Sequence, residues 1–121
     1  MKYMLMMFGD GGEMAATADP AWVRDMMTFM GDFNDELTKT GELVAAHGLA
    51  FPSTAKTVSY ADGQVAVTDG PYAESKESLA GFWILDVAGE ERAIELAGRV
   101  AYWSRKAELR EVPDAAPEFD A

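Results

Sequence analysis

Residues 68–83 read TDGPYAESKESLAGFW and place a turn between two apolar runs of the chain. The turn signal is Asp69-Gly70-Pro71, because Gly permits a positive φ while Pro fixes its own φ and donates no backbone hydrogen bond. The run that follows, residues 79–87, is strongly apolar and predicts a buried strand. Within it, Gly81 indicates a place where another backbone comes close.

The run before the turn predicts one half of a β-hairpin. Residues 56–60 and 64–68 flank Ala61-Asp62-Gly63, whose Asp-Gly pair is typical of a tight hairpin turn. Farther upstream, residues 43–49 predict another strand. Tyr3 to Phe8 is a continuous apolar run, which predicts a central strand buried on both faces.

Two segments between these strands predict helices. The first begins at Asp19-Pro20, since Asp accepts hydrogen bonds from exposed amides and Pro lacks one, and it ends at Gly41. The second extends from Gly89 to about Ala101, and residues 108–112 then alternate like a last, half-buried strand. The expected apolar stripes are Trp22, Met26, Phe29, Met30, Phe33 and Leu37 on the first helix, and Ile94, Ala97, Val100 and Ala101 on the second.

The order strand, helix, strand, hairpin, strand, helix, strand predicts an α+β fold of the ferredoxin-like plan. In that plan an antiparallel sheet carries both helices on one face. Two helices cannot cover both faces, so the apolar side chains of the bare face need a second sheet. A homodimer supplies one, because twofold symmetry provides a matching face. A monomer with a polar outer face is the alternative, and the apolar run of residues 3–8 argues against it.

Length and charge limit the kinds of protein this chain can be. Its 121 residues fit one domain, which we place at residues 1–112, followed by a flexible acidic tail at 113–121. A hydrophobic fraction of 49% excludes intrinsic disorder for most of the chain. The net charge of −11, from 10 basic and 21 acidic residues, opposes direct binding to nucleic acid or to an anionic membrane.

Other features indicate the cellular compartment. The chain contains no cysteine, which excludes disulfides and thiolate metal sites and suits a reducing cytoplasm. The apolar start at residues 1–8 is too short for a signal peptide, and residues 9–13 do not form a small-residue cleavage site. No apolar run approaches the length that spans a bilayer. We therefore expect a cytoplasmic protein.

His47 is the only histidine, and so the only side chain with an unperturbed pKa near neutrality. It falls in the second predicted strand, on the same face as Leu43, Ala45 and Leu49. It is either a hydrogen-bonded structural residue or a general acid or base whose second ring nitrogen a carboxylate orients. Asp69, at a strand end where a turn can aim it into a cavity, is the natural partner. Alternatively, its carboxylate braces the turn by accepting from backbone amides.

An acid–base–acid series follows the turn at Glu74, Lys76 and Glu77. One interpretation is a salt-bridged or solvated loop. The other is a ligand-binding site in which Lys76 meets an anionic group, while Glu74 or Glu77 accepts a proton. Tyr72 either adds a phenol donor to this site or packs its ring beneath the turn.

No metal or cofactor site is expected. With one His and no Cys, only carboxylates remain as metal ligands, and no Asp-rich ligand spacing stands out. The glycine-rich residues 9–12 are not a phosphate loop, because no Lys-Ser or Lys-Thr pair follows them. We interpret Met26, Met27 and Met30 as filler of the core or of a dimer interface.

The chain resembles the DGPF-domain, YCII-related family of small bacterial proteins over nearly its whole length. The landmarks Gly41-Glu42-Leu43 and Asp62-Gly63 match, and Tyr72 stands where the family usually has Phe. The closest agreement lies at Val67–Pro71, Ala73–Glu77, Ala80–Phe82 and Asp86–Val87.

The resemblance implies a ferredoxin-like dimeric α/β barrel. The broader superfamily includes small lyases and isomerases that act on chlorinated or lactone aromatic metabolites. Some YCII-like relatives use a His and an Asp, and by analogy this pair transfers to His47 and Asp69. Other DGPF-domain proteins are linked to alternative sigma factors, which implies an accessory or sensing role.

Two functional hypotheses follow. The first is a homodimer that binds a small molecule through Tyr72, Glu74, Lys76 and Glu77 and has no chemistry of its own. The second is a cofactor-free lyase or isomerase, in which a base removes a proton and Lys76 stabilises the developing oxyanion. We favour the first, because the sequence contains no secure catalytic constellation.

Overall fold

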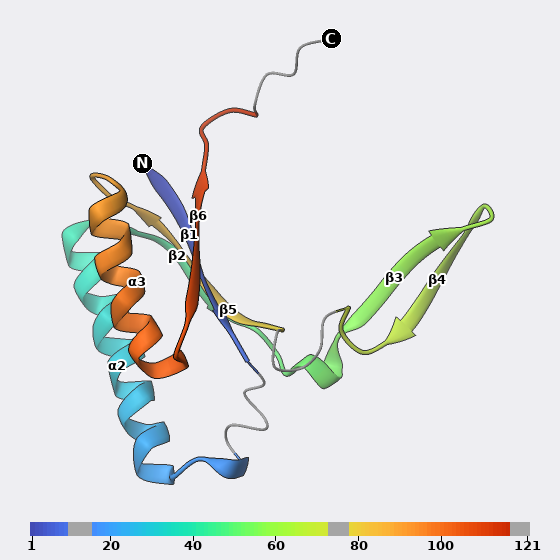
Figure 1. Ribbon diagram of the computed structural model, residues 1–121, viewed down its shortest axis with the longest axis horizontal. Helices are drawn as coiled ribbons and strands as arrows, with labels where there is room; N and C mark the ends of the chain where they lie inside the picture. Colours follow the sequence, from blue (N-terminus) through green and yellow to red (C-terminus); the bar gives the residue numbers. More distant parts are fainter. Residues whose placement is uncertain (10–15, 73–77, 117–121) are drawn as a thin grey trace.

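Both helices lie on one face of a four-stranded antiparallel sheet (Figure 1). The computed structural model describes residues 1–9, 16–72 and 78–116. The sheet has the strand order β2-β5-β1-β6, and β3 and β4 form a separate two-stranded sheet. This arrangement confirms the predicted α+β, ferredoxin-like plan. The elements along the chain are β1 (Lys2–Phe8), α2 (Pro20–Thr40), β2 (Leu43–Gly48), the 3₁₀ turn η1 (Pro52–Thr54), β3 (Lys56–Ala61), β4 (Gln64–Asp69), β5 (Leu79–Asp86), α3 (Glu90–Ser104) and β6 (Ala107–Val112).

The two faces of this sheet differ in how well they are covered. We call the face toward the helices the inner face and the opposite one the outer face. Along β1, Tyr3 and Leu5 are buried on the inner face, whereas Met4 and Met6 on the outer face are only half-buried. The strand is central, as predicted. The prediction that both of its faces are buried is not met within one chain, because both helices lie on the inner side.

The helix α2 begins and ends where the sequence predicts. Asp19 caps it and accepts a hydrogen bond from a backbone amide of the first turn (2.9 Å), while Pro20 takes the first helical position. At the other end Gly41 has a φ of 80°, and its amide donates to carbonyl oxygens of the last turn. The predicted apolar stripe faces the sheet, with Phe33 and Leu37 fully in the core.

The helix α3 buries the predicted stripe only in part, because Val100 is in the core and Ala97 packs against it, but Ile94 does not. Ala93, Leu96 and Val100 are buried, whereas Ile94 is 57% exposed. Ala93 and Leu96, one residue before the predicted Ile94 and Ala97, complete the buried side of the helix. The structure places Leu96 against the sheet together with Ala93, whose small side chain lets the helix approach closely. The helix also continues past the predicted end, to Ser104.

An aromatic cluster joins the helices to the sheet. The Trp103 ring of α3 lies 5.6 Å from that of Trp22 and 5.7 Å from that of Phe29, both on α2. Phe29 stacks on Phe33 at 5.2 Å, and Phe33 meets Trp83 of β5 edge to face at 5.8 Å. These contacts fix both helices against the inner face.

The β3–β4 hairpin stands apart from this core (Figure 1). It confirms the predicted pairing and its Asp-Gly turn, where Asp62 and Gly63 have φ values of 54° and 77°. The predicted Asp-Gly-Pro turn comes next. Gly70 has a φ of 107°, its amide donates to the Ala55 carbonyl (2.8 Å), and its carbonyl accepts from the Thr57 hydroxyl (2.8 Å). The hairpin extends to the side opposite the helices.

The last strand, β6, ends at Val112. The predicted tail begins at the next residue, and its described part, residues 113–116, is exposed and contains neither helix nor strand. Residues 117–121 lie outside the described residues, so the flexible tail stays a prediction.

Candidate functional site

A cavity whose lining includes four methionines lies between α2 and the ends of β1, β2 and β5. We call it the methionine pocket. It consists of two adjoining cavities of about 290 Å³ and about 270 Å³. Both are lined by Met7, Met26, Met27 and Ala80, and Met30 lines the first. Methionine side chains are flexible and polarisable, so such walls adapt to the shape of a bound molecule.

Asn34 supplies a side-chain amide to the wall of the first cavity. The indole N–H of Trp83 donates to its side-chain oxygen at 2.7 Å, which fixes the orientation of the amide. No described residue accepts a hydrogen bond from the Asn34 NH₂ group. A molecule in the pocket can therefore take this donor.

The second cavity has aromatic walls. Phe8, Phe51 and Trp103 line it, and Trp103 belongs to the aromatic cluster between the helices. Aromatic faces and edges next to thioethers make good contacts with another flat ring. The two cavities together thus combine apolar surface with one amide donor.

The described walls of the methionine pocket contain no Asp, Glu, Lys or Arg. His47 of β2 is the one residue in them with a titratable side chain, and its ring lies toward the outer face, next to Phe82. This is notable in a chain with a net charge of −11. Transfer of an unpaired ion from water into such a site is costly. The pocket therefore favours a neutral molecule.

A bidentate ion pair lies away from the methionine pocket, just before the start of β2. Arg92 of α3 donates from Nε and Nη2 to the carboxylate of Glu42 at 2.9 Å each, and Thr40 donates to the same carboxylate at 2.8 Å. The Arg92 hydrogen bonds are the main cause that holds the pKa of Glu42 below its ordinary value, against the opposing effect of burial. This pair attaches α3 to the start of β2.

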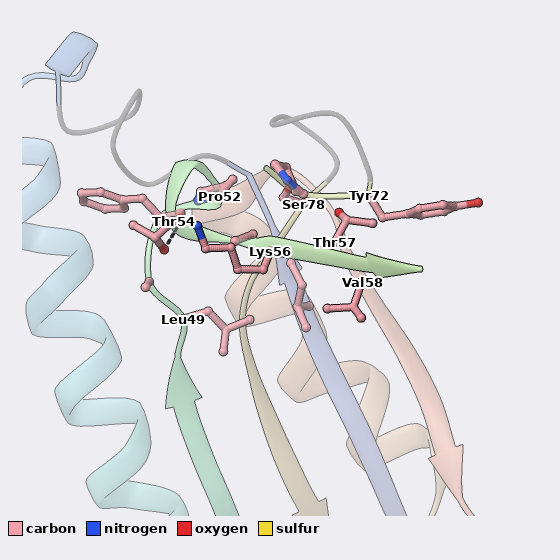
Figure 2. A pocket seen from close by; sticks show the side chains of 13 residues that line it. Leu49, Pro52, Thr54, Lys56, Thr57, Val58, Tyr72 and Ser78 are labelled. Carbon is pink, nitrogen blue, oxygen red and sulfur yellow. Dashed lines mark hydrogen bonds between the residues drawn. The ribbon is translucent and has the colours of Figure 1, made fainter. Parts of the chain in front are cut away.

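A second, broader cavity of about 670 Å³ opens at the base of the hairpin (Figure 2). We call it the hairpin-base cavity. The turn η1 forms one wall, held by the hydrogen bond from the Thr54 hydroxyl to the Phe51 carbonyl (2.7 Å). Lys56 and Val58 of β3 form another. Tyr72 lines the rim, but its ring points away from the cavity and the residue is 96% exposed.

His47 lies on β2 opposite Phe82 of β5, and the two ring centroids are 5.7 Å apart. The prediction that His47 shares a strand face with Leu43 and Ala45 is only partly right. Ala45 shares the outer face with His47, whereas Leu43 pairs with Leu85 and packs in the core. The reason is a β-bulge between Leu43 and Ala45, which shifts the alternation of side chains along the strand.

Asp69 lies at the end of β4, and its carboxylate forms an ion pair with Lys56, its cross-strand partner. The side chain is 84% exposed and lines neither cavity described above. Among the described residues, no hydrogen bond joins Asp69 to His47 or to a backbone amide. The structure of one chain thus places the two predicted catalytic residues in separate surroundings, and their pairing stays a prediction.

The predicted ligand-binding residues are only partly open to inspection. Tyr72 lies at the hairpin-base cavity, as described above. Glu74, Lys76 and Glu77 lie outside the described residues, so the ligand site proposed for them also stays a prediction.

Metal binding has no candidate in the described ranges 1–9, 16–72 and 78–116, where no three His, Asp or Glu side chains gather closely enough to hold an ion. In the same ranges, every helix is too short or too polar to cross a membrane.

The methionine pocket is a candidate site that the sequence analysis does not predict. The sequence predicts Met26, Met27 and Met30 as filler of the core or of a dimer interface. Met30 does pack against the core, but all three also lie on the wall of a cavity. The available signal was Asn34, which follows Met26 and Met30 at steps of four. A polar amide on an otherwise apolar stripe indicates that its position faces a hydrogen-bonding partner or a cavity, and not only apolar side chains.

Comparisons with known proteins agree with the sequence resemblance. A family model of the YCII-related domain matches residues 1–115. An uncharacterised protein of Rhizobium meliloti (strain 1021), R00369, is 28% identical over 101 residues, which cover 80% of this chain and 77% of that protein. The chain therefore belongs to the YCII-related domain family.

Proposed function

We propose that this protein binds a small, neutral, largely apolar molecule in the methionine pocket, and that it works as a homodimer. The observation that carries the binding proposal is the lining of the pocket. Its described walls are mainly apolar and aromatic, contain no Asp, Glu, Lys or Arg, and present one amide donor, Asn34. Small-molecule sites typically have this composition, because apolar walls supply affinity and a few polar groups supply orientation.

The same lining indicates the class of ligand. Thioethers and aromatic rings surround the space, and both interact favourably with a flat aromatic ring. The Asn34 NH₂ group then selects a molecule with an oxygen acceptor, such as a hydroxyl or carbonyl. We infer a small aromatic compound that carries one such oxygen.

The homodimer is proposed from the outer face of the sheet. Met4 pairs with Ile84 and Met6 with Phe82 across β1 and β5, so these four residues form one apolar patch at the centre of that face. All four are only half-buried in a single chain. A second copy related by a twofold axis brings the identical patch, which makes the interface self-complementary.

Binding without chemistry suits an accessory or sensing role linked to transcription regulation, the role that the family resemblance implies. The lyase or isomerase alternative needs an acid–base pair. In the described part of one chain, the His47 ring contacts Phe82 while Asp69 bridges Lys56. No specific observation in the described residues favours the enzymatic alternative.

The binding proposal is tested by titration with the neutral fluorescent probe N-phenyl-1-naphthylamine. We expect saturable binding at one site per chain. Ala80→Leu should weaken it by about tenfold or more, because Ala80 lines both cavities and a larger side chain fills part of the space. Ala88→Leu, at an exposed position in the loop before α3, is the matched control and should bind like the wild type. Equal binding by all three proteins would contradict the proposal.

The role of Asn34 is tested with two competing probes, 1-naphthol and naphthalene, which differ by one hydroxyl. We expect the wild type to prefer 1-naphthol by about two- to tenfold, the size of one net hydrogen bond. Asn34→Leu should abolish this preference, whatever it does to overall affinity, because both probes experience the same altered wall. A preference that persists in Asn34→Leu would remove Asn34 from the site.

A further inference from the structure

The β3–β4 hairpin has one apolar face and one polar face. Val58 pairs with Val67 and Tyr60 pairs with Val65, so these four side chains lie on the same side of the ribbon. We call this set the apolar hairpin face. The opposite side carries the alternate residues Thr57, Ser59, Ala61, Gln64, Ala66 and Thr68.

The apolar hairpin face is uncovered in the described part of the chain, where its four side chains are between 62% and 73% exposed. The polar contacts of the hairpin strands do not attach them to the core. They lie within the hairpin and the turn after it, as in the ion pair of Lys56 with Asp69 and the bond from Thr57 to Gly70. A two-stranded hairpin by itself is marginally stable at best in water. Strict apolar–polar alternation is the pattern of strands that bury one face.

The direction of the hairpin indicates what covers it. It extends to the side opposite the helices (Figure 1), which is also the side of the uncovered outer face of the sheet. Six residues span about 20 Å, whereas two facing sheets lie about 10 Å apart. The hairpin is therefore long enough to reach past the outer face and along a second sheet stacked there.

We propose that the hairpin is an arm with which each chain holds a second copy of itself. The apolar hairpin face packs on the partner chain when the outer faces of the two sheets meet. By twofold symmetry each chain gives one arm and receives one. This inference rests on the proposed homodimer and assigns it a second contact region, far from the apolar patch of the sheet.

The apolar area is large enough for this task. A complete valine side chain has a surface of about 60–120 Å², and a complete tyrosine side chain has about 150–250 Å². Multiplied by the exposed fractions of the four residues, these areas give roughly 350 Å² for each apolar hairpin face. Two arms and the surfaces they cover would bury about 1,400 Å² in total, and stable specific interfaces bury about 1,200–2,000 Å². The arms alone thus reach the lower part of this range, and the outer faces add to it.

The hairpin-base cavity extends the same surface. Leu49 and Phe51 line it together with Val58, and they are 45% and 52% exposed. The apolar hairpin face therefore continues into the cavity at its base. A partner chain seated on the arm closes the cavity, which places Tyr72 next to the interface.

The test compares the dimer dissociation constants of matched variants by analytical ultracentrifugation. Val58→Asp/Val67→Asp puts two charges on the apolar hairpin face. Ser59→Asp/Ala66→Asp puts the same charges on the neighbouring cross-strand pair, on the polar side. We expect the first variant to dimerise about 100-fold more weakly or worse, and the second to stay within about threefold of the wild type. A third variant, Ile84→Asp, disrupts the apolar patch of the sheet instead.

The outcomes separate the arm from the dimer. If Val58→Asp/Val67→Asp dimerises like the wild type while Ile84→Asp is monomeric, the homodimer stands and the arm is wrong. A monomeric wild type at micromolar concentration overturns both. Hydrogen exchange on the wild type covers the case in which charges unfold the hairpin. Amides of residues 56–69 should lose protection on dilution to monomer, and unchanged protection would overturn the arm.

Discussion

The two faces of the four-stranded sheet have the same strands but different surroundings. On the inner face Leu5 and Leu85 are fully buried beneath the two helices. Their strand neighbours Met4 and Ile84 pair with each other on the outer face and remain half-buried. Alternation along a strand predicts two faces of the sheet, but it does not say how many of them the chain itself can cover. In this chain the helices α2 and α3 cover one face of the sheet.

The helices do not fill the inner face completely, because a cavity remains between α2 and one end of the sheet. Around the first half of α2, small residues such as Ala80 and Gly81 meet flexible methionines in place of interlocking branched side chains. The resulting cavity has the size of a small molecule. We therefore assign the gap in the inner face to a ligand, and the uncovered outer face with its hairpin to a second chain.

The largest expected effect contrasts neighbouring residues of β5 on the two faces. Leu85→Ala should lower the free energy of unfolding by about 2–5 kcal/mol, because it leaves a cavity in a fully buried position. Ile84→Ala, one residue away on the outer face, should cost about 1 kcal/mol or less in a dilute, monomeric sample, because the site is partly hydrated already. Urea unfolding followed by tryptophan fluorescence measures both. Equal losses would contradict the difference between the faces.

A second prediction concerns the ion pair that attaches α3 to the edge of the sheet. Glu42→Gln should lower the free energy of unfolding by about 1–3 kcal/mol at pH 7, since Glu42 accepts two hydrogen bonds from Arg92 in a mostly buried setting. Glu36→Gln, which loses an exposed pair with Arg99, is the matched control and should change it by less than about 1 kcal/mol.

The pH dependence of this effect has a definite sign. The pKa of Glu42 is lower in the folded than in the unfolded chain, chiefly because Arg92 binds its ionised form. Its contribution is therefore complete above the unfolded-state value of about 4.3 and is lost as the pH falls through the lower folded-state value. The stability difference between wild type and Glu42→Gln should shrink below that pH. A constant difference down to pH 2 would count against the assignment.

The smallest effects come from two glycines, and their signs should be opposite. Gly81→Ala should destabilise by about 1 kcal/mol, because its Cβ would lie 3.0 Å from the His47 carbonyl oxygen of the neighbouring strand β2. Gly98→Ala should stabilise by about 0.5–1 kcal/mol, since it lies in α3 with nothing near the new methyl group. Thermal unfolding of both variants measures the signs. A stabilised Gly81→Ala would show that the strands can move apart freely.

Local signals predicted most of the fold. Asp19 and Gly41 mark the ends of α2, and Asp62-Gly63 marks the hairpin, because caps and turns act through the backbone of adjacent residues. Ile94 and Leu43 were misplaced for a different reason. Whether Ala93 or Ile94 faces the sheet depends on how α3 packs on it, and the face of Leu43 depends on a β-bulge. Neither is fixed by neighbours in sequence.

The candidate site was harder to predict, because it depends on what packing leaves empty. The charged stretch after the turn attracted attention through its composition, yet Glu74, Lys76 and Glu77 lie outside the described residues. The methionine pocket gave only a weak signal, the amide of Asn34 on an apolar stripe. The cavity is lined by residues from distant parts of the chain, such as Met7 and Trp83. The spacing of residues in the sequence does not predict that these side chains lie close together.

The measurement that tests the proposed function most directly is a methyl NMR titration with 1-naphthol, using the methionine signals as reporters. Met7, Met26, Met27 and Met30 line the pocket, whereas Met4 and Met6 lie on the outer face. We predict that the signals of Met26, Met27 and Met30 shift and saturate together, while those of Met4 and Met6 stay in place. Shifts confined to Met4 and Met6, or no saturable shift at all, would contradict a ligand site on the inner face.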